Sequence, residues 1–163
     1  MNDGKINLLF VCIGNICRSP SAEAVMRSLV EKENLSAKIV CDSVGTNGLH
    51  DGEQADPRSR ADAEKRGIAV TSISRRSSVP DDFDRADYII AMDDRNIRDL
   101  KNLDRHEKHA KKLFKLTDFS ASKDWDHVPD PYYGDAEGFE TVLDILEEAC
   151  AGLLAKIKAD HRL

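Results

Sequence analysis

A cysteine and an arginine, with five residues between them, stand in a segment suited to phosphate chemistry. The segment reads Cys12-Ile13-Gly14-Asn15-Ile16-Cys17-Arg18-Ser19-Pro20. A tight loop between a strand and a helix directs several backbone N–H groups at one point, and the positive end of the helix dipole adds to them. Gly14 and Asn15 tolerate a left-handed backbone in such a loop. The guanidinium of Arg18 can hold two phosphate oxygens at once. The spacing predicts an anion site of phosphate size.

Cys12 adds a nucleophile to this site. The same N–H groups and Arg18 favour its thiolate form, which would be positioned for in-line attack on phosphorus. The hydroxyl of Ser19 can donate to that sulfur and stabilise it as a leaving group. A cysteine alone would be interpreted as a small core residue, but its combination with Arg18 predicts catalysis. The glycine pair and lysine of a nucleotide-binding loop are absent, which argues against an NTPase.

The elements around this segment predict an α/β fold. Apolar runs predict strands at residues 8–11, 38–41, 88–92 and 113–116. Helical spacing predicts helices at 20–33, 56–67, 94–103 and 139–157. Capping signals place Ser19, Asp56 and Asp93 at the starts of the first three, with Pro20 and Pro57 next to the first two. This alternation predicts a single three-layer domain over residues 1–163, in which a mostly parallel, four-stranded sheet has helices on both faces. Ligands of such sheets bind beyond the carboxyl ends of the strands, where the loop from Cys12 begins.

Composition narrows the class of protein. With 163 residues, 40% hydrophobic and 33% charged, the chain has the composition of one soluble globular domain. The longest apolar run near the start, Ile6 to Ile13, is too short to span a membrane and lacks the features of a secretory signal, so we expect a cytoplasmic protein without a membrane partner. The net charge of −6 argues against nucleic-acid binding. The four cysteines lack zinc or disulfide spacing and are expected to be thiols, with Cys41 and Cys150 in the core.

The chain resembles the low-molecular-weight protein tyrosine phosphatase family. The resemblance rests on the segment from Val11 to Ala24 and on Asp130-Pro131-Tyr132-Tyr133-Gly134-Asp135. Asp42-Ser43, Asp56-Pro57-Arg58 and Met92-Asp93 also stand where that family has comparable segments. The resemblance covers nearly the whole chain, and its first motif is highly specific. It implies an enzyme that hydrolyses phosphotyrosine and small aryl phosphates.

The resemblance also implies a role for each catalytic residue. Cys12 would form a phosphocysteine intermediate, Arg18 would stabilise the transferring phosphoryl group, and Asp130 would protonate the leaving oxygen and then activate water. General acid catalysis of this kind is typically worth about 10²–10⁴-fold. Pro129 and Pro131 flank Asp130 and favour an extended, stiff loop that could hold the carboxyl over the site. No cofactor or metal is implied, because Arg18 and the backbone N–H groups offset the phosphate charge.

The resemblance assigns further residues to substrate binding and support. The predicted substrate-binding residues are Ile13, Gly14, Asn15, Ile16, Cys17, Ser19, Leu49 and Tyr132. Leu49 and Tyr132 would form walls around the substrate ring, although the family often has a large aromatic where Leu49 stands. Ser43 and Ser72 are predicted to support the loop by hydrogen bonding, with Ser72 in a position where many members have histidine. None of the five histidines falls in a recognised motif, and we expect them on the solvated surface.

Regulation and partners are also implied only by the resemblance. The family cysteine that matches Cys17 forms a disulfide with the nucleophile under peroxide, so a redox role is predicted for Cys17. The tyrosines that match Tyr132 and Tyr133 are phosphorylated in some eukaryotic members. The expected partner is a phosphotyrosine-containing protein, with a bacterial tyrosine kinase as one candidate. We expect a monomer or a weak dimer.

Four alternatives remain open. An arsenate reductase of the same scaffold needs further cysteines in mid-chain, and none stands between residues 42 and 149. A protein arginine phosphatase carries threonine where this chain has Ile16, which favours phosphotyrosine. A non-catalytic phosphate-binding module would have no need of Cys12 together with Asp130. A thiol redox protein would require a different spacing from that of Cys12 and Cys17.

Overall fold

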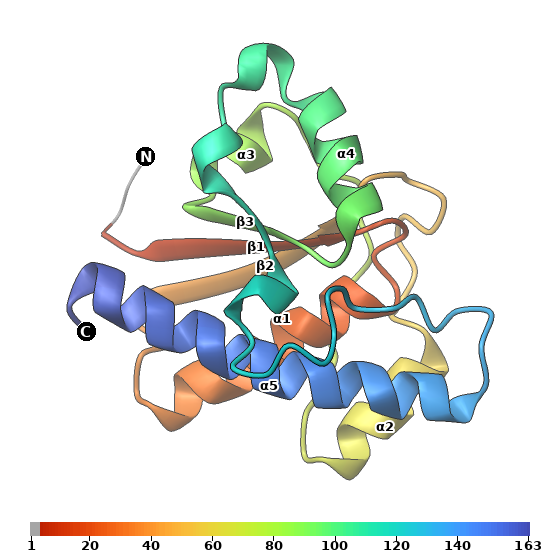
Figure 1. The fold of residues 1–163 in the computed structure, drawn as a ribbon. Helices are drawn as coiled ribbons and strands as arrows, with labels where there is room; N and C mark the ends of the chain where they lie inside the picture. The colour runs from red at the N-terminus through yellow and green to blue at the C-terminus, as the bar shows by residue number, and fades with distance from the viewer. Residues whose placement is uncertain (1–3) are drawn as a thin grey trace.

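Four parallel strands form the sheet at the centre of the fold (Figure 1). The computed structural model describes residues 4–163. The strands are β1 (Ile6–Cys12), β2 (Ile39–Gly45), β3 (Tyr88–Ala91) and β4 (Leu113–Lys115), in the spatial order β2-β1-β3-β4. Every paired neighbour among them runs parallel, which confirms the predicted sheet.

Strand β1 is buried on both faces, as its continuous apolar sequence predicts. Leu8 and Phe10 point into one hydrophobic cluster, whereas Leu9 and Val11 point into another on the opposite face. This alternation follows from the two-residue period of a strand. Full burial of each such side chain is worth about 1.5–3 kcal/mol, so the two clusters anchor β1 firmly. The rigid strand then delivers Cys12 to its carboxyl end.

Helices cover both faces of the sheet (Figure 1). The larger cluster is formed with α1 (Arg18–Lys32) and α5 (Ala136–His161), and α2 (Pro57–Lys65) packs against α5 on that side. The opposite face carries α3 (Asp81–Arg85) and α4 (Asp94–Leu103). Short 3-10 helices are η1 (Arg105–Glu107), η2 (Ala110–Lys112) and η3 (Leu116–Phe119). The three-layer prediction is therefore confirmed. Within residues 4–163, no helix combines the length and apolar character needed to cross a membrane.

Some element boundaries differ from the prediction. Strand β2 continues to Gly45, because Val44 is buried and pairs with Val11 instead of starting a loop. Strand β4 ends at Lys115, and Leu116 begins η3 instead. The capping predictions for α2 and α4 are confirmed. Asp56 and Asp93 each accept a hydrogen bond from a backbone N–H of the first turn, at 2.8 Å.

The strand order places a crevice at the end of β1. The chain leaves β1 towards β2 on one side and later reaches β3 on the other side. In the parallel registers, Cys12 pairs with Gly45, and Val11 pairs with Ala91. The three carboxyl ends therefore lie side by side. The helices that follow β1 and β3 lie on opposite faces of the sheet, which opens a ligand-binding crevice at this point.

Candidate active site

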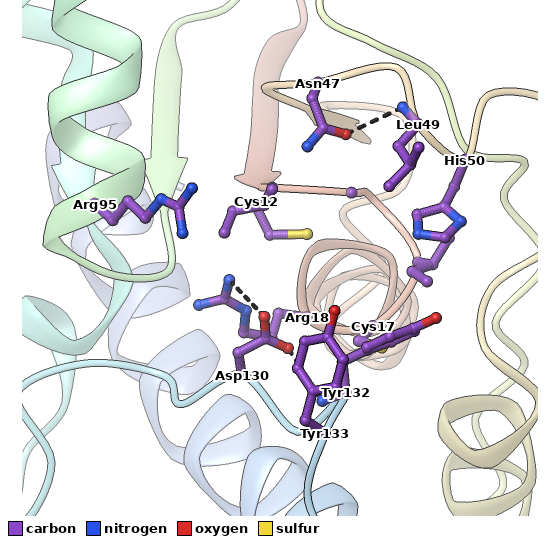
Figure 2. A pocket seen from close by; sticks show the side chains of 13 residues that line it. Cys12, Cys17, Arg18, Asn47, Leu49, His50, Arg95, Asp130, Tyr132 and Tyr133 are labelled. Atoms are coloured by element: carbon purple, nitrogen blue, oxygen red, sulfur yellow. Dashed lines mark hydrogen bonds and ion pairs between the residues drawn. The ribbon is translucent and has the colours of Figure 1, made fainter.

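A pocket of about 280 Å³ opens at the carboxyl end of β1 (Figure 2). Cys12 comes from the end of β1, Arg18 from the start of α1, and Asp130 from the loop before α5. The other lining residues are Ile13, Gly14, Ile16, Cys17, Asn47, Leu49, His50, Arg95, Tyr132 and Tyr133. The fold thus brings together the three predicted catalytic residues, although up to 118 positions separate them in the sequence.

Asn15 fixes the turn of the loop between Cys12 and Arg18. It has a positive φ of 57° and is almost fully buried. Its side-chain nitrogen donates to the hydroxyls of Ser19 at 2.8 Å and Ser43 at 3.0 Å, and its oxygen accepts from the backbone N–H of Arg75 at 3.1 Å. Ser43 in turn donates to the buried carboxylate of Glu23 at 2.7 Å. These bonds compensate for the left-handed backbone that an asparagine tolerates better than most residues.

The loop lies directly against the end of β2. A Cβ atom on Gly45 would lie 2.6 Å from the carbonyl oxygen of Ile13, so only glycine fits there without a shift of backbone. The N–H groups of Thr46 and Asn47 donate to the carbonyls of Cys12 and Ile13, at 2.9 and 3.1 Å. This close approach fixes the position of the loop relative to the sheet.

The predicted supporting residue Ser72 is replaced in this network by Ser74. The hydroxyl of Ser74 donates to the carbonyl oxygen of Gly14 at 2.9 Å, and Ser74 is buried. Ser72 makes no such bond within the described chain. The segment is extended, with Ile73 in a bridge to Gln54. A step of two residues therefore keeps the same face and moves the hydroxyl about 7 Å along the chain.

Cys12 and Ser19 form a buried pair. The sulfur of Cys12 lies 3.0 Å from the Ser19 hydroxyl oxygen, and each residue is at most 3% exposed. The prediction that Ser19 is the N-cap of the first helix is wrong, because the helix begins at Arg18 with Cys17 in the cap position. The hydroxyl faces the sulfur and not a backbone N–H of the first turn, which agrees with the predicted support of a thiolate.

Arg18 is a buried cation held by two carboxylates. Its Nη1 donates to Oδ2 of Asp93 at 2.5 Å and to the carbonyl oxygen of Val128 at 3.1 Å, and its Nη2 lies 3.7 Å from Asp130. Burial lowers the pKa of Arg18, but the charges of Cys12, Asp93 and Asp130 outweigh it and raise the pKa overall. For the acid Asp93 burial has the opposite effect and raises the pKa. The hydrogen bonds from Arg18 and Asn96 outweigh burial and lower the pKa of Asp93 below its ordinary value. The guanidinium is therefore positioned before any substrate arrives.

Asp130 lies at the mouth of the pocket, on the side of Arg18 (Figure 2). Its side chain is 44% exposed, and Oδ1 accepts the backbone N–H of Tyr132 at 3.1 Å. Arg58 ties this loop to α2, because it donates to the carbonyl oxygen of Tyr132 at 3.1 Å and pairs with Asp56 through two nitrogens. The carboxyl of Asp130 is thus accessible to solvent yet held close to Arg18.

Aromatic and apolar side chains surround the opening. Tyr132 is half-buried, whereas Leu49 is 79% exposed and therefore lies at the rim. Ile16 is buried against Cys17. Tyr133, which lines the same pocket, is 93% exposed. These side chains give the pocket mouth a largely apolar wall.

Two histidines depart from the expectation of a solvated surface. His50 lines the pocket, with its ring centroid 6.1 Å from that of Tyr132 and Nδ1 2.6 Å from Glu53. His109 is only 5% exposed, with its ring nitrogens 2.8 and 2.7 Å from Asp104 and Asp84. Both histidines come from polar stretches, so local composition gave no signal of the pocket position of His50 or of the burial of His109.

All four cysteines are free and buried. Cys41 and Cys150 belong to the main hydrophobic cluster, which confirms the prediction for them. Burial, with a further contribution from Asp56, raises the pKa of Cys17 to about 12. Cys17 lines the pocket with Cys12 but is a protonated thiol near neutral pH. The described residues contain no group of three or more His, Cys, Asp or Glu side chains arranged to hold a metal ion.

The family model described as low molecular weight phosphotyrosine protein phosphatase matches residues 7–163. The chain belongs to this family. Among its curated relatives is the low molecular weight protein-tyrosine-phosphatase of Streptomyces coelicolor, 43% identical over 152 residues that cover 91% of this chain and 92% of the relative. The human low molecular weight phosphotyrosine protein phosphatase is 37% identical over 150 residues, which cover 92% of this chain and 94% of the human one.

Solved structures of this phosphatase family share the fold. A crystal structure of a protein tyrosine phosphatase from Entamoeba histolytica, with Hepes in the active site, matches with a TM-score of 0.91 and 46% identity. The match covers 96% of this chain and 99% of the other. The structure of YfkJ from Bacillus subtilis matches with a TM-score of 0.88, 37% identity and 99% coverage of both chains. The present chain is therefore a phosphatase with the fold of this family.

Proposed function

We propose that the chain hydrolyses phosphotyrosine through a covalent phosphocysteine on Cys12. The observation that carries this proposal is the convergence of Cys12, Arg18 and Asp130 in one pocket at the carboxyl end of β1. A phosphate-binding module would need the cation of Arg18. It would not need the buried sulfur of Cys12 or the carboxyl of Asp130 in the same pocket. The family and its curated relatives support activity on phosphotyrosine.

The first step transfers the phosphoryl group to sulfur. Arg18 and the N–H groups of the loop bind the equatorial phosphate oxygens, and the Cys12 thiolate attacks phosphorus opposite the phenolic oxygen. The P–O bond breaks while the protonated carboxyl of Asp130 gives its proton to that oxygen. Tyrosine leaves as the neutral phenol, and the products on the protein are phosphocysteine and the Asp130 carboxylate.

The second step returns the sulfur to its starting state. The Asp130 carboxylate takes a proton from water, whose oxygen attacks phosphorus, and the P–S bond breaks. Inorganic phosphate leaves with the water oxygen. The thiolate that departs is stabilised by the hydroxyl of Ser19, 3.0 Å from the sulfur. Asp130 is protonated again and ready for the next turnover.

The walls of the pocket favour an aromatic substrate. Ile16 offers no hydrogen-bonding side chain for a guanidinium, which argues for phosphotyrosine over phosphoarginine. Tyr132 provides a ring at the opening, and Leu49 adds an apolar rim. A shorter phosphoserine would gain little contact with Tyr132 or Leu49.

Hydrolysis assays on matched variants test this proposal. We would compare para-nitrophenyl phosphate, a phosphotyrosine peptide, a phosphoserine peptide and phosphoarginine for the wild type, Cys12→Ser and Asp130→Ala. The aryl phosphates should be the preferred substrates. Cys12→Ser should abolish their turnover, and Asp130→Ala should lower kcat on the peptide by about 10²–10⁴-fold. Asp126→Ala, in an exposed position of the same loop, is the control and should retain full activity.

Trapping distinguishes an enzyme from a phosphate binder. Rapidly quenched Asp130→Ala should carry phosphate on Cys12, measured as a mass increase on the peptide that contains it. Tight phosphate or vanadate binding by the wild type without turnover would favour the binding module. Preference for phosphoarginine would overturn the argument from Ile16.

Cys17 supports a reversible oxidation of the same site. Peroxide would oxidise the Cys12 thiolate to a sulfenic acid. The thiol of Cys17 would then condense with this sulfenic acid to form a disulfide and release water. A thiol reductant should then restore activity to the wild type but not to peroxide-treated Cys17→Ser. Loss of activity that reductant cannot restore in the wild type would contradict this role.

The biological setting follows from the same proposal. The substrate class is a phosphotyrosine-containing protein, and a bacterial tyrosine kinase is one candidate by family resemblance. We infer a cytoplasmic monomer or weak dimer that binds neither nucleic acid nor membrane. Sedimentation analysis with and without liposomes and duplex DNA would test the oligomeric state and the absence of these two partners, and co-sedimentation with either would contradict the proposal.

A further inference from the structure

Arg95 projects into the catalytic pocket without a partner. It stands in the first turn of α4, and Figure 2 shows its guanidinium directed from that helix towards the space in front of Cys12. The residue is exposed. Within residues 4–163 its side chain makes no hydrogen bond or ion pair. An arginine in this situation keeps all five of its N–H donors for a ligand.

None of the nearby carboxylates of the described chain forms an ion pair with Arg95. Asp93 binds Arg18, and Asp94 pairs with Lys115 at 3.1 Å. Asp130 also faces Arg18. Asp99, one helical turn after Arg95, is in the position from which an ion pair is common, but no pair forms. In a chain of net charge −6, Arg95 is thus a cation at the pocket wall that pairs with no acidic side chain of the described chain.

A second hollow continues from the catalytic pocket past Arg95. It has a volume of about 310 Å³ and shares Ile13, Asn47 and Arg95 with the catalytic pocket. The far side of the hollow contains Asp99, which would repel an anion. The favourable place for a negative group is therefore the edge shared by the two hollows. Arg95 itself stands at that edge.

We propose that Arg95 forms a subsite for an acidic residue that flanks the phosphotyrosine of a protein substrate. The proposal rests on the proposed phosphotyrosine activity and adds a preference to it. The ligand is the carboxylate of an aspartate or glutamate, which the guanidinium can bind through two parallel N–H donors. Arg18 and the loop bind the phosphate itself, so Arg95 is left to bind the neighbouring residue of the substrate and not the reacting group.

The expected effect is small and depends on salt. An exposed ion pair is worth little in water, so we expect an acidic residue at the right position to raise kcat/KM by about two- to fivefold at low ionic strength. Raising the salt concentration to about 1 M should remove most of this gain, because the screening length then falls to about 3 Å. A preference that is independent of salt would overturn the proposed ion pair with Arg95.

A peptide scan tests the proposal. The peptides carry one phosphotyrosine and either glutamate or glutamine at each position from two residues before it to two residues after it. The measured quantity is the ratio of kcat/KM for the glutamate peptide to that for its glutamine partner. At one position or more the wild type should give a ratio of about two to five. Arg95→Gln should bring that ratio close to one, and Arg95→Glu should bring it below one.

Arg98→Gln is the matched control, because it removes the same charge from the same helix at an exposed position outside both hollows. It should leave the ratio unchanged. The inference is overturned if no position gives a ratio above one, if Arg95→Gln leaves the ratio intact, or if Arg98→Gln lowers it equally. In each of these cases turnover of the glutamine peptides shows that the phosphatase activity itself holds. Loss of the proposed function would instead appear as no turnover of any peptide by the wild type.

Discussion

The hydroxyl oxygen of Ser19 lies 3.0 Å from the sulfur of Cys12, and both residues are buried from solvent. The side-chain nitrogen of Asn15 donates to the same oxygen at 2.8 Å, so the hydroxyl hydrogen is available for another acceptor. The carbonyl oxygen of Val44 is a weaker candidate at 3.4 Å. The arrangement therefore directs a hydrogen-bond donor at the sulfur, where it stabilises negative charge.

Replacing Ser19 by alanine should slow turnover. A hydrogen bond to a charged group is worth about 1.5–3 kcal/mol, which corresponds to roughly a 10- to 100-fold lower kcat. The loss should fall mainly on breakdown of the phosphocysteine, because the sulfur then leaves as an unsupported thiolate. A burst of para-nitrophenol in rapid-mixing kinetics, followed by slow release of phosphate, would reveal this. Ser21→Ala, at another buried serine of α1, should retain normal kinetics, and equal effects of the two variants would contradict the argument.

Gly45 should be intolerant of a side chain because β2 meets the loop there. The Cβ of an alanine would lie 2.6 Å from the Ile13 oxygen and 3.0 Å from that of Asn47, both backbone atoms. We expect Gly45→Ala to lower the free energy of unfolding by about 1–3 kcal/mol. Because the loop must move, kcat/KM on para-nitrophenyl phosphate should fall by at least about tenfold. Urea unfolding and steady-state kinetics measure both effects.

Gly138→Ala provides the contrast for Gly45→Ala. Its Cβ would meet the Pro131 side chain at an ordinary 3.6 Å, and the position lies in the first turn of α5. The free energy of unfolding should stay level or rise by up to about 1 kcal/mol, because alanine favours a helix over glycine. Equal destabilisation by the two substitutions would mean that the close approach at Gly45 is not the cause.

Local sequence signals predicted the parts of the site that the chain builds from adjacent residues. The loop from Cys12 to Arg18 needs only a strand, a glycine, an asparagine and a following helix, all visible in one short segment. The caps Asp56 and Asp93 were equally visible, because a capping carboxylate acts on residues two or three positions later. Even so, Ser19 satisfied the sequence rule for an N-cap while its hydroxyl serves the sulfur of Cys12 instead.

Contacts between distant segments could not be predicted in the same way. Asp93 holds Arg18 across 75 positions of sequence, and only the pairing of β1 with β3 makes them neighbours. His109 comes from a polar stretch, but Asp84 and Asp104 enclose it. From the sequence, Arg95 would be interpreted as an ordinary surface cation. The structure shows that it lines the catalytic pocket, because α4 forms one wall of it. The position of β3 beside β1, which the sequence does not state, decides the environment of Arg18 and Arg95, whereas His109 meets Asp84 from 25 positions away.

Thiol-specific labelling should distinguish Cys12 from the other cysteines. Burial raises the pKa of both Cys17 and Cys41 to about 12, so near pH 7 only about one in 10⁵ of these two groups is the reactive thiolate. Burial raises the pKa of Cys150 further, so its thiolate is rarer still. Iodoacetamide at pH 7 should therefore modify Cys12 first, with parallel loss of activity, and inorganic phosphate should slow the reaction. Peptide mapping by mass spectrometry identifies the site. Labelling of Cys17 as fast as Cys12 would show that the environment of Cys17 is misjudged.

Asp82 should make folding stability depend on pH in the acid range. Its buried carboxylate accepts hydrogen bonds from both terminal nitrogens of Arg75, at 2.9 and 3.0 Å, and from the backbone N–H of Ser78 at 2.6 Å. Burial raises its pKa, but these bonds and Arg85 lower the pKa below the ordinary 3.8. The unfolded chain therefore takes up the proton first. The stabilisation is present above about pH 4 and is lost as the pH falls through the lower pKa of the folded state.

Asp82→Asn removes this titration and tests it. At pH 7 the variant should be less stable than the wild type by about 1–3 kcal/mol, since its amide cannot replace the charged hydrogen bonds. This difference, or gap, in the free energy of unfolding between the wild type and the variant should stay constant between pH 8 and 5. It should narrow below about pH 4, where the wild-type carboxylate becomes protonated on unfolding. Urea unfolding across this range measures the gap. Asp81→Asn, at the exposed neighbouring position, should differ from the wild type by no more than about 0.5 kcal/mol at every pH. A gap for Asp82→Asn that persists unchanged to pH 2.5 would show that the carboxylate is not linked to folding in this way.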